Sequence, residues 1–164
     1  MSYYFGPPLL LLVALLEVSV LPMFRIAGLQ PNLMLVLLIA WLMVRGANEA
    51  FIFAPIGGVL LGLVDGAPMG TALIALAPLA FLQELRGSQL REGGLVMALA
   101  FTIVMSFFYN YVFLAVYTLE GHSGAWLTAS LRIIVPAALL NVMVLVPIYG
   151  LLTATSTERR TAYV

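Results

Sequence analysis

Residues 94–119 read GLVMALAFTIVMSFFYNYVFLAVYTL, an apolar stretch without a single charged side chain. About 20 apolar residues in a helix cross the hydrocarbon core of a bilayer, which is roughly 30 Å thick. This stretch is therefore long enough to span a membrane. The rest of the chain is similar, since 63% of its 164 residues are hydrophobic and 9% are charged. That composition excludes a soluble domain with a polar surface.

The gaps between charged residues mark six apolar segments that we expect to be transmembrane helices. They cover residues 8–27, 31–45, 50–64, 69–84, 94–119 and 131–153. The second, third and fourth segments are short or contain Pro and Gly, so we expect little tilt, a thinned bilayer or irregular turns there. The predicted fold is all-α: a polytopic integral membrane protein whose six transmembrane helices form one compact bundle, a single domain over residues 1–164.

The distribution of Arg predicts the orientation of this bundle, because cytoplasmic loops are enriched in basic residues. With six crossings, one side carries both termini and the loops after the second and fourth segments. That side holds five of the seven basic residues, all of them Arg, and the other side holds Arg25 and Arg132. We therefore expect both termini in the cytoplasm.

The inventory of reactive side chains is small. The net charge is zero, and no block of basic residues is present that could follow a phosphate backbone, so we expect no nucleic-acid partner. Cys is absent and His122 is the only His. Asp65 is the only Asp, and the predicted topology puts Glu17 far from it. We therefore expect no enzyme, no metal site and no cofactor.

Three polar side chains inside apolar segments are candidates for a functional site. Glu17 lies near the middle of the first segment, where an exposed carboxylate costs about 2.5–3.5 kcal/mol on insertion scales. Asn141 lies near the middle of the last segment and could meet Glu17 if the two helices are neighbours. Asn110 lies in the fifth segment, one residue after Tyr109 and on a different helix face. The favoured interpretation of Glu17 and Asn141 is an interhelical hydrogen bond, and the alternative is contact with a partner or ligand.

Small residues recur at every fourth position of the third segment: Ala54, Gly58, Gly62 and Gly66. This spacing lets two helix backbones approach closely, which promotes association where lipid supplies no hydrophobic drive. The pattern predicts an interface. A helix of the same chain is the favoured partner, and a second protein is the alternative.

Three stretches together resemble a known family. Gln-Pro-Asn-Leu at residues 30–33 opens an apolar helix, and GGVLLGLVDGAPMG follows at residues 57–70. The third stretch runs from Pro136 to Pro147 with Asn141 between them. In this order they resemble MreD, the rod shape-determining membrane protein of bacteria. The family commonly has an acidic residue at the position of Asn32, so the chain differs from the family there.

The resemblance implies a noncatalytic scaffold subunit of the bacterial cell-elongation machinery, which builds peptidoglycan at the inner membrane. Such a subunit binds MreC, a single-pass membrane protein with a large periplasmic part. Through it, the subunit helps to link the actin-like MreB filament to a glycosyltransferase and a penicillin-binding transpeptidase. The motif residues Pro31, Asn32, Gly58, Gly62, Asp65 and Asn141 become structural or partner-interface candidates.

Residues 65–70 are expected to form a tight turn on the outer side. Gly66 and Gly70 would supply unusual backbone angles and Pro68 rigidity. Asp65 would cap the start of the fourth helix.

A different class of function is the alternative. The chain also resembles, in architecture, the substrate-specific component of an energy-coupling-factor vitamin transporter, a six-helix small-molecule-binding subunit. A vitamin pocket needs several convergent polar groups near the outer face, and the sequence offers only Asp65, Glu120, His122 and Arg132, which it does not bring together. A channel lined by Glu17 and Asn141 is a third possibility, which would require an oligomeric ring.

Overall fold

The computed structural model describes residues 2–25, 28–45, 47–68, 70–81, 94–122 and 126–161. Within these ranges every regular element is a helix, which confirms the all-α class. The elements are α1 (Ser2–Ser19), η1 (Leu21–Phe24), α2 (Leu33–Arg45), α3 (Ala47–Val64), α4 (Thr71–Phe81), α6 (Gly94–Leu119), α7 (Trp126–Ala129), η2 (Ser130–Ile134) and α8 (Val135–Thr161).

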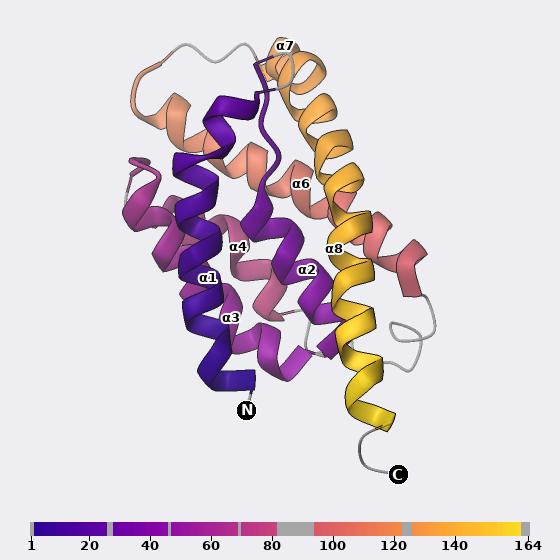
Figure 1. Cartoon of the computed structure of the whole chain (residues 1–164). Coiled ribbons are helices and arrows are strands. Elements are labelled where there is room, and N and C mark those ends of the chain that lie inside the picture. The colour runs from indigo at the N-terminus through magenta and orange to yellow at the C-terminus, as the bar shows by residue number, and fades with distance from the viewer. Residues whose placement is uncertain are drawn as a thin grey trace.

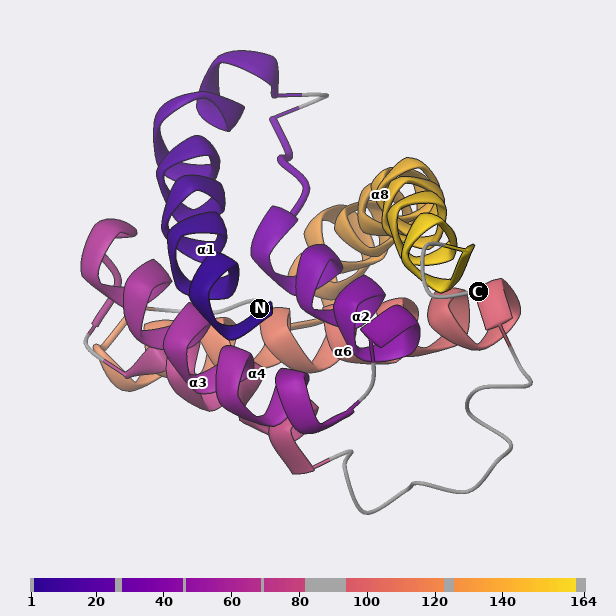
Figure 2. The ribbon, with the colours of Figure 1, turned by 60° about the horizontal axis from the view of Figure 1, so that its bottom comes forward.

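Successive helices, short ones included, alternate in direction along the chain, so that α1 begins and α8 ends at the same end of the molecule (Figure 1). Helix α2 lies between α1 and α8, above α3, α4 and α6 in the view of Figure 2. It packs against all five of these helices. These five helices therefore surround α2 as the central helix.

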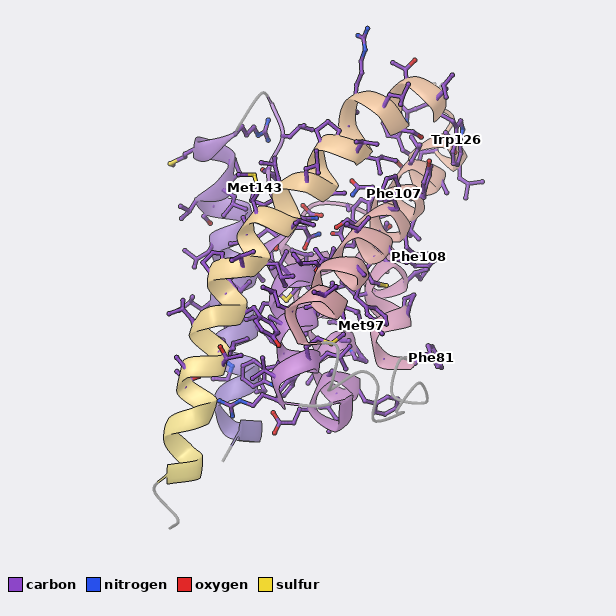
Figure 3. All side chains as sticks on the ribbon, turned by 90° about the vertical axis from the view of Figure 1, so that its right-hand side faces the viewer. Phe81, Met97, Phe107, Phe108, Trp126 and Met143 are labelled. Atoms are coloured by element: carbon purple, nitrogen blue, oxygen red, sulfur yellow. The ribbon has the colours of Figure 1, made fainter. Side chains whose placement is uncertain are left out.

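The central position of α2 follows from its composition. Every residue from Met34 to Leu42 is buried, and all of them are apolar. A helix that is hydrophobic on all sides is stable only when other helices cover it. Its neighbours in turn expose large apolar side chains, and Figure 3 shows two of them, Phe81 and Phe108, pointing away from the bundle. An apolar outer surface of this extent is typical of a protein that faces lipid.

Three helices are long and apolar enough to cross a membrane, at Gly6–Met23, Gly94–Leu119 and Trp126–Thr155. The apolar helices Leu33–Arg45, Glu49–Val64 and Thr71–Phe81 are shorter. With 11 residues, α4 is only about 16 Å long at a rise of about 1.5 Å per residue. That length is roughly half of the hydrocarbon core.

Some of the predicted boundaries are wrong. The segment 94–119 matches α6, whereas the first helix ends at Ser19 instead of residue 27, because Pro22 has no N–H to donate to a continuing α-helix. The last helical stretch begins at Trp126, earlier than 131, and reaches α8 through the π-helical segment η2. Residues 26–27 and 82–84, and the Arg residues at 86 and 91, lie outside the described residues.

The small-residue face of α3 packs against α4 of the same chain. A Cβ atom on Gly58 would lie 2.7 Å from the Cα atom of Leu73, so the two backbones touch there. A Cβ atom on Gly62 would lie 3.9 Å from the Cβ atom of Ala72, an ordinary contact. Ala54 is fully buried in the core. Gly66 lies two residues after Val64, the last residue of α3, so the predicted helical face ends at Gly62.

The turn between α3 and α4 contains two glycines with left-handed backbone angles. The φ angle is +68° at Gly66 and +93° at Gly70, which agrees with the expected role of both residues. The predicted cap by Asp65 is not found among the described residues. Instead, the backbone N–H of Thr71 donates to the Pro68 carbonyl at 3.1 Å and its hydroxyl donates to the same oxygen at 2.8 Å.

The packing of α3 on α4 predicts an engineered disulfide. The chain has no Cys, so Gly62→Cys and Ala72→Cys would introduce its only two thiols. The 3.9 Å separation of the two Cβ positions lies within the range of about 3.5–4.5 Å found in disulfides. We expect oxidation in membranes to close this bond within one chain, measured as loss of thiol labelling without dimer formation.

The control pair is Gly150→Cys with Ala72→Cys, because no atom lies within 4 Å of a Cβ at Gly150. Dimers linked through Gly62→Cys alone would show that this face joins two copies.

Candidate functional site

The first turn of α2 begins inside the bundle, where its backbone N–H groups need partners other than water. Asn32 is the N-cap residue, because its carbonyl accepts the first helical bond from Val36 at 3.1 Å. Its side-chain oxygen accepts a hydrogen bond from the backbone N–H of Leu35 at 2.7 Å. Pro31, the preceding residue, has no N–H to satisfy. The Pro-Asn pair therefore explains why α2 starts at Leu33.

Glu17 of α1 supplies the next partner. Its carboxylate accepts a hydrogen bond from the backbone N–H of Met34 at 2.9 Å, and the side chain is only 6% exposed. The N-terminus of a helix carries a partial positive charge and favours an acidic group. The side chain of Glu17 therefore occupies the position at the N-terminus of α2 where an anion could otherwise bind.

Asn141 of α8 joins the same segment to α6. Its side-chain oxygen accepts a hydrogen bond from the backbone N–H of Asn32 at 2.7 Å. Its amide nitrogen donates to the Ser106 hydroxyl of α6 at 2.9 Å. Asn141 is 2% exposed and Ser106 is fully buried. One side chain thus holds three separate parts of the chain together.

These residues form one polar cluster, which we define as Glu17, Asn32, Ser106, Tyr109 and Asn141. The expected approach of Glu17 and Asn141 occurs through the backbone of residues 32–34, which lies between them, instead of through a direct bond. Tyr109 joins through an interaction with the Asn32 side chain.

Asp65 lies closer to this cluster than the sequence indicated. Although Asp65 itself is exposed, its charge acts on both Glu17 and Tyr109. The reason is the packing of α3 against α1, which brings the end of α3 beside the middle of the bundle.

Sequence reasoning missed Ser106 and did not assign Tyr109 to a site. Tyr109 is buried and stacks on Phe113 with 4.7 Å between ring centroids. Asn110 donates to the Ser106 carbonyl of its own helix at 2.8 Å. Tyr109 and Asn110 therefore contact different parts of the protein, as expected for adjacent residues on different faces of a helix. No feature of the sequence distinguishes Ser106 from any other helix hydroxyl.

No protein-family model, curated protein or solved structure matches this chain. The geometry of the site therefore has to support the functional interpretation. In the cluster, the Ser106 hydroxyl is paired with an amide and not with a base that could activate it. The described part of the chain contains no group of three His, Cys, Asp or Glu residues that could hold a metal ion. The cluster is suited to fixing the positions of α1, α2, α6 and α8.

A second polar feature is a cavity of about 820 Å³ at the end of α6. It lies between the turn that precedes α4, the last turns of α6 and the segment that leads into α8. Glu120 and Arg132 both line it, together with Thr71, Asn110 and Tyr117. The structure therefore brings together two charged residues that the sequence left apart. His122 does not contribute to this lining but stacks on Tyr117 at 4.3 Å.

Proposed function

We propose that this chain is a noncatalytic scaffold subunit of the MreD type, acting in the bacterial cell-elongation machinery. The observation that carries the proposal is that the first and third of the stretches that resemble the family contact each other, and the second packs on the residue that follows the first. Asn32 of the first stretch donates to Asn141 of the third at 2.7 Å. Gly57 of the second packs on Met34, where an added Cβ would lie 2.9 Å from the sulfur. The resemblance thus corresponds to one contiguous unit of the fold.

The arrangement of the helices supports six crossings with both termini in the cytoplasm of a bacterial inner membrane. The three shorter helices lie between the first and second long ones along the chain, and α1 begins at the end of the molecule where α8 ends (Figure 1). A short helix such as α4 crosses in this proposal with a turn at one end and a locally thinned bilayer.

The internal pairing of the polar cluster supports a scaffold more than a transport path. A path for ions or substrates would need polar groups that are free to bind them. Glu17, Asn32 and Asn141 instead hold the start of α2, so that the outer helices form a rigid apolar surface. A single-pass protein such as MreC would pack its helix on that surface, and MreB, the glycosyltransferase and the transpeptidase would join indirectly.

Purification of the tagged chain from its native membranes in mild detergent tests this proposal. We expect mass spectrometry to identify a single-pass protein with a large periplasmic part, together with cell-wall synthases. Recovery of a pair of ATPase subunits instead would contradict the scaffold function.

The cavity favours a second candidate function, a small-molecule-binding subunit like the substrate-specific component of a vitamin transporter. Its volume of about 820 Å³ lies within the range of roughly 300–1,000 Å³ of small-molecule sites. A water-soluble vitamin recovered in equal amount with the protein would support this candidate over the scaffold.

A further inference from the structure

The cavity at the end of α6 carries two opposite charges at its opening. Glu120 follows the last residue of α6, and Arg132 lies in the π-helical segment η2. Both side chains line the cavity and both are exposed, so their charged groups remain accessible. A π-helical turn places its side chains differently from an α-helix and is frequent at functional sites. A ligand that satisfies both groups must itself carry a negative and a positive charge.

The two groups differ in what they bind best. The planar guanidinium of Arg recognises phosphate through paired hydrogen bonds. The carboxylate of Glu120 attracts an ammonium group. The opening therefore matches a phosphate linked to an ammonium group.

The rest of the lining is mostly apolar and includes Phe113, Ile133 and Ile134. Asn110 adds one polar atom there: its nitrogen is used by the Ser106 carbonyl, and its oxygen accepts no hydrogen bond from the described residues. An apolar interior below a charged opening suits a molecule with a hydrocarbon part.

We propose that this cavity binds a zwitterionic phospholipid, with its phosphate at Arg132, its ammonium group at Glu120 and the start of its chains against the apolar lining. Phosphatidylethanolamine has this chemistry. The site is separate from the scaffold proposal, because the residues that line it are not members of the polar cluster.

Calorimetric titration of the purified full-length protein tests the proposal. The probes are short-chain phosphatidylethanolamine, short-chain phosphatidylglycerol, which lacks the ammonium group, and glycerophosphoethanolamine, which lacks the chains. We expect the first to bind about tenfold more tightly than phosphatidylglycerol, the effect of one charged hydrogen-bonding group. It should also bind more tightly than glycerophosphoethanolamine, which cannot bury a hydrocarbon part in the cavity. Glu120→Gln should equalise the two lipids, and Arg132→Gln should weaken both by about tenfold.

The control is Arg25→Gln, which removes the same charge from an exposed residue that does not line the cavity. It should leave binding of every probe unchanged. Equal affinity of the wild-type protein for the two lipids would overturn the zwitterionic site, and this comparison needs no variant that must fold. Equal affinity for the lipid and for glycerophosphoethanolamine would overturn the lipid in favour of a water-soluble zwitterion.

Discussion

Replacement of Asn141 by Leu is expected to lower the melting temperature of the detergent-solubilised protein by about 5–15 °C. Leu has a similar size but can neither accept the hydrogen bond from the Asn32 N–H nor donate to Ser106. Two buried polar groups would lose their partner, at a cost of about 1–3 kcal/mol each. Interhelical hydrogen bonds in membranes are worth about 0.6–2 kcal/mol, so the total lies near 2–4 kcal/mol.

The matched control is Asn110→Leu. Asn110 has the same side chain, but it lies outside the polar cluster and its nitrogen bonds only to the Ser106 carbonyl one turn earlier in its own helix. We expect a change of less than about 3 °C, because no bond between helices is lost. Heating followed by size-exclusion chromatography measures both variants. Equal effects of the two substitutions would mean that Asn141 does not join α2 to α6 and α8.

Gly58→Ala should destabilise the protein by about 1–3 kcal/mol, although it adds a single methyl group. That methyl would lie 2.7 Å from the Cα atom and 3.2 Å from the backbone nitrogen of Leu73. Backbone atoms of a packed helix cannot move aside as a flexible side chain can, so α4 must shift as a whole.

Gly62→Ala is the comparison for that substitution, one turn further along α3. The added methyl would meet only the Ala72 Cβ, at 3.9 Å. Since Ala is a better helix former than Gly by up to about 1 kcal/mol, we expect a neutral or slightly stabilising effect. The melting temperatures of the two variants, measured side by side, should differ by at least about 5 °C. A Gly58→Ala variant as stable as Gly62→Ala would exclude the close contact between α3 and α4.

The helices could be predicted from sequence where apolar residues run without interruption. Residues 94–119 contain no charge and no Pro, so both ends of α6 were predicted correctly. The end of α1 was placed too late, because a prediction based on gaps between charges extended the first segment past Pro22 to residue 27. The positive backbone angles of Gly66 and Gly70 could be predicted, since few other residues adopt them in a turn.

The contacts that make up the site could be predicted only in part. An acid and an amide at mid-helix were expected to find partners, but both bond to backbone N–H groups at the start of α2, and almost every residue has such a group. The grouping of Glu120 with Arg132 depends on how the segment before α8 folds over the end of α6. Sequence spacing cannot predict that arrangement, because it results from packing between distant parts of the chain.

The polar cluster is the centre of this account, and Glu17 tests it most directly. Glu17→Gln keeps an oxygen that can accept the Met34 N–H bond, whereas Glu17→Leu removes it. The measurement is the melting temperature of both variants beside the wild-type protein. We predict that Glu17→Gln stays within about 3 °C of wild type and that Glu17→Leu falls by about 5–10 °C. A Glu17→Gln variant as unstable as Glu17→Leu would contradict the account, because it would show that the charge of Glu17, and not its hydrogen bond to α2, holds the bundle together.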